Sequence, residues 1–153
     1  GMDVYALSPS ITDMSIFENN GVTRVETAEE LYAKCDYISL HIPATPKYLK
    51  SVDRHLLESM PKGAILVNTA RKEVINEEDL MAVLGEREDL KYASDIAAAC
   101  QAELVEKYGN RVFATPKKQG AETAEANYNA AKAAATQIVD FFVNGNRKFQ
   151  VNK

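Results

Sequence analysis

Short apolar runs, each stopped by turn-forming residues, predict the strands of this chain. The run Val4–Leu7, for example, stops at Ser8-Pro9-Ser10, because proline cannot donate a backbone hydrogen bond and serine favours turns. The run Ala64–Asn68 is apolar without alternation, which is typical of a parallel strand covered on both faces. The predicted strands are Val4–Leu7, Val22–Val25, Tyr37–Ile42, Ala64–Asn68, Lys91–Ile96 and Arg111–Thr115.

Helical signals lie between these runs. Thr27 and Glu30 form a capping-box pattern, in which each side chain satisfies a backbone amide near the other, and the helix that follows carries Leu31 and Cys35 on one face. Two further helices are predicted, one over Ser51–Met60 and one that Asn76 caps, that carries Leu80, Val83 and Leu84, and that ends at Gly85.

The last helix has the clearest pattern. Gly145 stands where a glycine cap ends a helix, and the tail Asn146–Lys153 is too short to form a domain. The apolar stripe of this helix recurs at intervals of four and three residues and consists of Ala124, Tyr128, Ala131, Ala135, Ile138 and Phe142.

Strands that alternate with helices over 153 residues predict an α/β fold with a doubly wound parallel sheet. This length suits one compact unit, or part of a larger protein. Ligands bind to open sheets of this kind outside the carboxyl ends of the strands. We therefore expect a site among the residues that follow the predicted strands, which are Ser8, His41–Pro43, Asn68–Arg71, Asp95 and Thr115–Gly120.

Composition narrows the function classes. The chain is 46% hydrophobic and 26% charged, with a net charge of -4, so no basic face is expected that would bind nucleic acid. No apolar run approaches the roughly 20 residues that span a bilayer, and no secretory signal opens the chain, so no membrane contact is expected. Cys35 and Cys100 form no CxxC pair, which favours a reducing cytoplasm over disulfides or a zinc site.

Three ordered motifs resemble one known family. CDYISLHIP (35–43), GAILVNTAR (63–71) and Ala114-Thr115-Pro116 are similar to the cofactor domain of the D-2-hydroxyacid dehydrogenases, over nearly the whole chain. Members of that family move a hydride between NAD and a small anionic 2-hydroxy acid. Within the family, the chain is most similar to the enzymes that oxidise D-3-phosphoglycerate to 3-phosphohydroxypyruvate in serine biosynthesis. The resemblance implies a Rossmann-like fold, NAD as cofactor and a homodimer.

The resemblance also implies roles for the residues at the strand ends. Arg71 matches the arginine that binds the substrate, and its planar guanidinium suits a carboxylate better than a lysine does. Asp95 matches the residue that binds the nicotinamide amide, with strand-end capping as the competing interpretation. His41 is interpreted as a packed histidine rather than a catalyst. The residues expected to border the cofactor are Ser8, His41, Ile42, Pro43, Thr69, Ala70, Arg71, Asp95 and Gly120.

The chain departs from the family pattern at its first strand. Ser8 stands where the family has an aspartate that binds the adenosine ribose. The nearest arginine in the sequence is Arg24, and no arginine is placed to accept a 2′-phosphate, so NAD is favoured over NADP.

Two further departures fall at the family's catalytic pair. Cys100 replaces the expected glutamate, and Lys117-Lys118 replace the histidine expected after Thr115-Pro116. A second ammonium and an apolar neighbour lower the pKa of a lysine towards the range useful for proton transfer. One of these lysines is therefore a candidate acid–base, as in a lysine-type subgroup that the chain resembles. The alternative is an inactive site in which the lysines bind an anion.

The glycine-rich turn G-x-G-x-x-G that opens a dinucleotide fold is absent from the sequence. We therefore expect a partial NAD-binding domain over 1–145 and a tail over 146–153, from the C-terminal part of a longer enzyme, and inactive alone. Its partner would be the missing N-terminal part. Without the central strand, the sheet should be divided. Other readings are a dehydrogenase for another 2-hydroxy acid, and a non-catalytic module that senses NAD(H).

Overall fold

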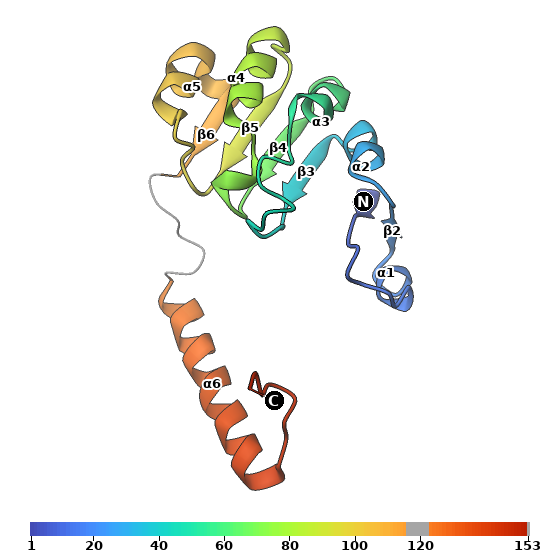
Figure 1. The fold of residues 1–153 in the computed structure, drawn as a ribbon, viewed down its shortest axis with the longest axis vertical. Helices are drawn as coiled ribbons and strands as arrows, with labels where there is room; N and C mark the ends of the chain where they lie inside the picture. The colour runs from blue at the N-terminus through green and yellow to red at the C-terminus, as the bar shows by residue number, and fades with distance from the viewer. Residues whose placement is uncertain (116–122, 153) are drawn as a thin grey trace. The chain divides into compact units, whose positions relative to one another are not determined.

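The computed structural model of this chain describes residues 1–115 and 123–152. The chain divides into two compact units, Gly1–Pro116 and Lys117–Lys153, and each is described by itself (Figure 1). The first unit contains strands and short helices. The second contains one long helix, α6 (Ala124–Asn144).

Each predicted strand is present in the first unit, with one or two residues trimmed from its ends. The strands are β1 (Val4–Ala6), β2 (Val22–Arg24), β3 (Tyr37–Leu40), β4 (Ile65–Asn68), β5 (Lys91–Ser94) and β6 (Val112–Ala114). The helices between them are α1 (Ser15–Glu18), α2 (Ala28–Lys34), α3 (Arg54–Ser59), α4 (Glu77–Glu86) and α5 (Gln101–Tyr108), with short 3-10 turns η1 (Lys72–Val74) and η2 (Gly109–Arg111).

The strands form two separate parallel sheets. One has the order β1-β2 and the other the order β3-β4-β5-β6. Among the described residues, β1 pairs only with β2 and β3 pairs only with β4, so the predicted division of the sheet is confirmed. Parallel strands joined through helices confirm the predicted α/β, Rossmann-like class.

The core lies between one face of the four-stranded sheet and the helices that cover it. Buried side chains alternate along the strands, as at Ile38 and Leu40 of β3, and pack into one cluster with Leu57 of α3, Leu84 of α4 and Leu104 of α5. Figure 1 shows α3, α4 and α5 lined up along this sheet. The strands are thereby fixed from one side.

The opposite face of this sheet is less covered than the sequence predicts. Tyr37 of β3 is 67% exposed and Phe113 of β6 is 62% exposed, while Ile65 and Val67 of β4 are half-buried. The prediction that Ala64–Asn68 is buried on both faces is therefore wrong for the described residues. The reason is that α3, α4 and α5 pack on the other side of β4.

Two helix starts differ from their predictions, α3 in its position and α4 in its cap. Helix α3 begins at Arg54 rather than at Ser51, because Val52 forms a parallel bridge with Ile75 and the Asp53 side chain caps the helix by accepting from the Leu56 amide at 3.2 Å. Asn76 occupies the N-cap position of α4 but makes no side-chain cap. Its side-chain amide instead donates to Asp79 Oδ2 at 2.7 Å.

Half of the predicted capping box is present at α2. Thr27 Oγ1 accepts from the Glu30 amide at 3.1 Å, as predicted. The Glu30 carboxylate accepts from the Glu26 amide at 3.3 Å rather than from that of Thr27. Only the contact of the Glu30 side chain is therefore shifted, to an amide one residue before the N-cap.

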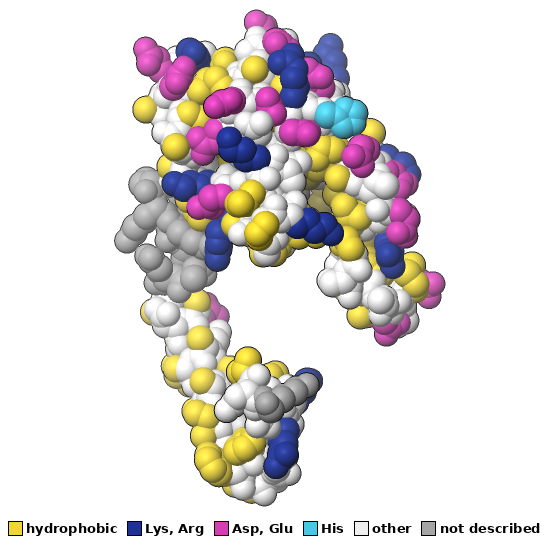
Figure 2. Space-filling view, in the orientation of Figure 1, with side chains coloured by type: hydrophobic (Ala, Val, Ile, Leu, Met, Phe, Trp, Pro, Cys, Tyr) yellow, Lys and Arg dark blue, Asp and Glu magenta, His cyan; other side chains and the backbone are white. Residues whose placement is uncertain are grey.

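The predicted last helix is confirmed as α6. Thr123 Oγ1 caps its start by accepting from the Ala126 amide at 3.1 Å, and Gly145 ends it in the left-handed conformation with φ 67°. Its predicted apolar stripe is exposed in the described residues of this unit, with Phe142 79% exposed. Figure 2 shows apolar side chains along the surface of this helix.

Tyr32 of α2 provides a test of the packing. Its ring is 3% exposed, and its hydroxyl is buried with no hydrogen-bond partner among the described residues. Burial, followed by the charge of Asp53, raises the pKa of Tyr32. Because an unpaired buried hydroxyl is costly, Tyr32→Phe should raise the free energy of unfolding by about 1 kcal/mol in denaturant titrations.

The matched control is Tyr108→Phe. The Tyr108 hydroxyl donates to the Met81 carbonyl at 2.7 Å, so its removal should lower the free energy of unfolding by about 1 kcal/mol. Equal losses in both variants would show that Tyr32 has a partner in solution.

Candidate functional site

The carboxyl ends of the four strands β3 to β6 meet at one edge of the sheet. In the parallel register, Leu40 lies opposite Asn68, Asn68 opposite Ser94, and Ser94 opposite Ala114. The residues that follow these strands are thus brought together along one edge, as the sequence predicted. They are His41–Pro43, Thr69–Arg71, Asp95 and Thr115.

Backbone and side-chain hydrogen bonds continue past the strand ends. The Asp95 amide donates to the Asn68 carbonyl at 3.2 Å, and the Thr115 amide donates to the Ser94 carbonyl at 3.1 Å. The Thr115 hydroxyl donates to the Asp95 carbonyl at 2.9 Å. The residues that follow β4, β5 and β6 are therefore joined into one row by hydrogen bonds.

Asn68 shapes the loop that carries Arg71. This side chain is 3% exposed, accepts from the Ala70 amide at 3.0 Å and donates to the Arg71 carbonyl at 2.9 Å. The Arg71 side chain is exposed, and its Nη1 donates to the Ala70 carbonyl at 2.8 Å. The Asn68 side chain thus holds the loop backbone, while the Arg71 guanidinium faces solvent and has N–H donors that remain free to bind a ligand.

Asp95 carries an open hydrogen-bond acceptor. It is half-buried, and its Oδ1 is buried with no partner among the described residues. An unpaired buried carboxylate oxygen is costly, so it favours a ligand that brings an N–H or O–H group. Because its side chain retains this unpaired acceptor, Asp95 is suited to binding a donor group of a ligand as well as to capping the strand end.

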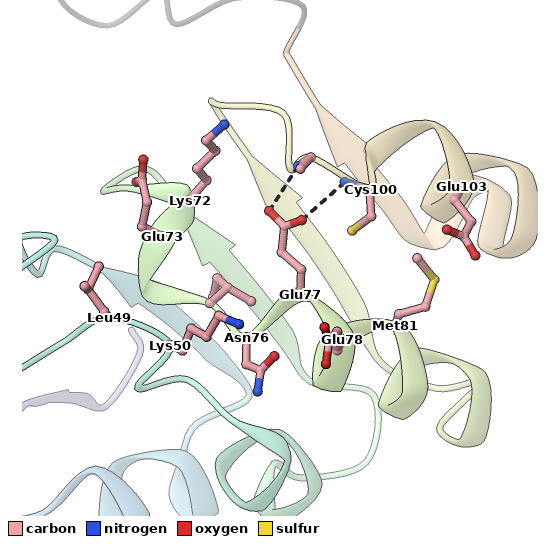
Figure 3. A pocket seen from close by; sticks show the side chains of 12 residues that line it. Leu49, Lys50, Lys72, Glu73, Asn76, Glu77, Glu78, Met81, Cys100 and Glu103 are labelled. Atoms are coloured by element: carbon pink, nitrogen blue, oxygen red, sulfur yellow. Dashed lines mark hydrogen bonds between the residues drawn. The ribbon is translucent and has the colours of Figure 1, made fainter. Parts of the chain in front are cut away.

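The loop after β5 ends at a carboxylate from another helix. Glu77 of α4 accepts from the Ala99 amide at 3.0 Å and from the Cys100 amide at 3.2 Å (Figure 3). Burial first, and then the charge of Glu77, raise the pKa of Cys100 to about 11. Cys100 is therefore a neutral thiol near pH 7.

A groove of about 900 Å³ lies beside this loop (Figure 3). Its walls come from the turn at Leu49 and Lys50, the start of α4 and the residues around Cys100. Arg71 and Asp95 are not among its lining residues, so the groove is separate from the row of strand ends.

The interpretation of His41 is wrong in one respect. The side chain is exposed rather than packed, and its Nε2 lies 2.9 Å from Ser39 Oγ. Ser39 is an exposed residue of β3, and His41, which follows the strand, is exposed as well. Of its neighbours, Ile42 is half-buried and packs against the core, and Pro43 is exposed.

Ser8 lies in the other sheet. It follows β1, is half-buried, and its carbonyl accepts from the Ile11 amide at 3.2 Å. Strand pairing does not join it to the row of strand ends. Arg24 on β2 donates to the Ile11 carbonyl at 3.3 Å and to Glu26 at 3.3 Å, while its Nε has no hydrogen-bond partner among the described residues. The charge of Arg24 is therefore paired with that of Glu26.

The remaining predicted residues divide into two sets. Thr69 is exposed and Ala70 is half-buried in the Arg71 loop. Lys117, Lys118 and Gly120 lie outside the described residues.

Three residues that organise the edge were given no individual role from the sequence, although Asn68 and Thr115 lie within the strand-end segments where the site was expected. Asn68 had a signal, because it is a polar residue at the end of an otherwise apolar strand. Thr115 had a weaker signal as part of a quoted motif. Glu77 had none, since it contacts backbone amides 22 and 23 residues further along the chain.

Among the helices of residues 1–115 and 123–152, none has the length and apolar content that a bilayer span requires. No group of three or more histidine, cysteine, aspartate or glutamate side chains within 1–115 and 123–152 is arranged to hold a metal ion.

Similarity to known proteins agrees with the geometry of this edge. The chain is 34% identical over 143 residues to D-3-phosphoglycerate dehydrogenase of Methanocaldococcus jannaschii and 29% identical over 162 residues to that of Haemophilus influenzae. These matches cover 90% and 99% of this chain. The NAD+-bound 3-phosphoglycerate dehydrogenase of Entamoeba histolytica is 44% identical, with a TM-score of 0.78 over 95% of this chain.

The chain spans only part of these relatives, with 26% and 37% of the two curated proteins and 45% of the Entamoeba chain covered. The family model for the D-isomer specific 2-hydroxyacid dehydrogenase NAD-binding domain matches residues 1–134. This match agrees with the parallel sheet and with the row of polar groups at its carboxyl edge. The chain therefore belongs to the D-isomer specific 2-hydroxyacid dehydrogenase family, and it carries sequence of that family's NAD-binding domain.

Proposed function

We propose that this chain forms part of an enzyme that oxidises D-3-phosphoglycerate to 3-phosphohydroxypyruvate with NAD, in serine biosynthesis. The observation that carries the proposal is that one sheet edge presents both an exposed arginine, Arg71, and a half-buried carboxylate with an unpaired oxygen, Asp95. Three relatives named D-3-phosphoglycerate dehydrogenase support this substrate.

The residues present suit the nicotinamide end of NAD. Bound NAD supplies the acceptor for the hydride that leaves C2 of the substrate. Oδ1 of Asp95 would accept a hydrogen bond from the carboxamide, which satisfies its open acceptor. The other residues proposed to border the cofactor are Ser8, His41, Ile42, Pro43, Thr69, Ala70, Arg71 and Gly120.

NAD is preferred to NADP in this proposal because of the surroundings of β1. A 2′-phosphate needs a free cation near Ser8. The guanidinium of Arg24 is instead engaged by Ile11 and Glu26.

Arg71 would hold the substrate carboxylate. Its guanidinium has five donors in a planar fork, of which the Ala70 carbonyl engages one. Two parallel hydrogen bonds would fix the carboxylate and place the C2 carbonyl that forms next to a positive charge. Asn68 holds the loop backbone in the shape that presents this side chain.

Oxidation of the 2-hydroxyl also releases a proton, which a protein group must take. Lys117 or Lys118 is proposed for this role, because no histidine follows Thr115 in the sequence. Cys100 cannot perform the chemical role of the family's glutamate, since its neutral thiol carries no charge near pH 7. A lysine that acts without a carboxylate partner is compatible with this arrangement.

The neutral thiol of Cys100 also favours a second candidate, a non-catalytic module that senses NAD(H) and uses the lysines to bind an anion. A third is a dehydrogenase for another small 2-hydroxy acid. Nicotinamide absorbance distinguishes between these candidate functions when it is recorded after the complete protein is mixed with NAD and D-3-phosphoglycerate. NADH formation supports the proposal, and binding without turnover supports the sensing module.

The proposed setting is a cytoplasmic homodimer in which residues 1–145 form part of the NAD-binding domain and 146–153 a tail. The free thiols of Cys35 and Cys100 support a reducing compartment. The remaining N-terminal part of the enzyme is the proposed partner of the free edges of β1 and β3.

Arg71→Lys in the complete protein should lower kcat/KM for the hydroxy acid by about 100-fold or more, because a lysine cannot form the paired contact. The dissociation constant for NADH should change little. Arg54→Lys is the control, since Arg54 lies on α3 and pairs with Glu58. Unchanged kinetics in Arg71→Lys would reject the role of this arginine.

Lys117→Ala and Lys118→Ala should differ sharply. The variant that lacks the acid–base should lose hydride transfer in single-turnover absorbance measurements, while the other keeps most of it. Lys62→Ala, in the exposed turn before β4, controls for the loss of one positive charge. Near-normal turnover in both variants contradicts the lysine mechanism.

A further inference from the structure

We propose that Glu77 is a positioning residue, whose carboxylate ties the start of α4 to the loop after β5 and thereby holds Asp95 in place for the nicotinamide. The inference rests on the proposed function for the role of Asp95. The tie itself is a feature of the fold.

The contact uses both oxygens of one carboxylate. Glu77 Oε1 accepts from the Ala99 amide at 3.0 Å and Oε2 accepts from the Cys100 amide at 3.2 Å (Figure 3). These amides lie at the start of α5, where the N-cap residue Cys100 makes no side-chain cap. A carboxylate is favoured at a helix start by the helix dipole and forms strong hydrogen bonds to amides. Glu77 therefore caps α5 from another helix.

The loop between Asp95 and Cys100 is fixed mainly at its two ends. At the strand end, Asp95 is held through its amide by Asn68 and through its carbonyl by Thr115. At the helix end, the Glu77 carboxylate provides the tie. Between them, the Ser94 hydroxyl donates to the Ile96 carbonyl at 2.9 Å. Ala98 packs in the core cluster between these ends. Loss of the helix-end tie therefore frees the amides of Ala99 and Cys100 and leaves the loop held by Ala98 and by its strand end.

Glu77 is itself attached to the segment that carries Arg71. Only η1 and two residues separate Arg71 from the start of α4, and in this stretch Val74 and Ile75 are buried. Ile75 also pairs with Val52 in a parallel bridge. The position of Glu77 is thus fixed by packing, so its carboxylate connects the arginine segment to the aspartate segment.

The charge of Glu77 also affects the pKa of the Cys100 thiol. It contributes, after burial, to raising the pKa of the Cys100 thiol to about 11. Glu103 acts in the same direction with a smaller effect. The thiol therefore provides a signal of the Glu77 carboxylate that does not depend on catalysis.

The test compares Glu77→Gln with Glu78→Gln in the complete protein. Glu78 lies in the same turn of α4 and the same groove, but it is exposed and makes no hydrogen bond to the loop among the described residues. Glu77→Gln should weaken NADH binding by about tenfold, because glutamine presents one acceptor where two amides need one each. Binding of ADP-ribose, which lacks the nicotinamide, should stay unchanged. Glu78→Gln should change neither.

Two readouts report the tie without NADH. Amide exchange at Ala99 and Cys100 should become at least about tenfold faster in Glu77→Gln. In a Cys35→Ala background, the pKa of the Cys100 thiol, followed by ultraviolet absorbance, should fall. Failure of the wild-type protein to bind NADH would reject the proposed function, and these readouts would still decide whether the tie exists.

Several outcomes overturn the positioning role. One is unchanged NADH affinity in Glu77→Gln, and another is an equal loss of NADH and ADP-ribose binding, which indicates general damage. Glu77→Asp carries the same test if Glu77→Gln does not fold. Its shorter side chain keeps the charge but does not reach both amides, so NADH affinity should again fall selectively.

Discussion

The parallel pairing of β4 with β5 is the interaction on which the rest of the site depends. It places Asn68 opposite Ser94, so that the segments after β4 and β5 leave the sheet at the same level. A slip of β4 by one residue would turn Leu66 and Asn68 to the uncovered face and Ile65 and Val67 into the core. Arg71 would then lose the buried amide that shapes its loop. The burial of Leu66 and Tyr92 on the helix side fixes this register, because both side chains must stay in the core. The chemistry at the edge thus depends on apolar packing beneath it.

Much of this arrangement could be predicted from the sequence, because its strands are local apolar runs. The runs around Ile38, Leu66 and Tyr92 are interrupted by turn residues, and the alternation of strands with helices then fixes the parallel order. The two short helices α1 and α5 were missed, since each has only one buried residue, Phe17 and Leu104, and therefore no apolar stripe. Coverage of β4 on both faces was also wrong. A local apolar run records that a strand is suitable for burial, whereas what covers it is decided by distant segments.

The site divides in the same way. The positions of Arg71 and Asp95 follow from where strands end, and the family resemblance adds their proposed roles. The exposure of His41 did not follow, because a histidine at a strand end has the same sequence context whether or not its face is covered. The long-range contact of Glu77 with the backbone at Ala99 and Cys100 could not be predicted either. Backbone amides carry no sequence identity, so a contact to them leaves no pattern in the residues that provide them.

The open acceptor at Asp95 has a consequence for discrimination between ligands. A buried oxygen without a donor destabilises the free protein, and a ligand that donates a hydrogen bond to this oxygen removes that free-energy penalty. A ligand of similar shape without a donor makes no such contact and leaves the buried oxygen unpaired. Sites built in this way reject a molecule that lacks the donor more strongly than apolar pockets reject a missing methylene. A nicotinamide analogue with a methyl ketone in place of the carboxamide is such a molecule. Asp95 would therefore contribute selectivity as well as affinity, from a single unsatisfied atom.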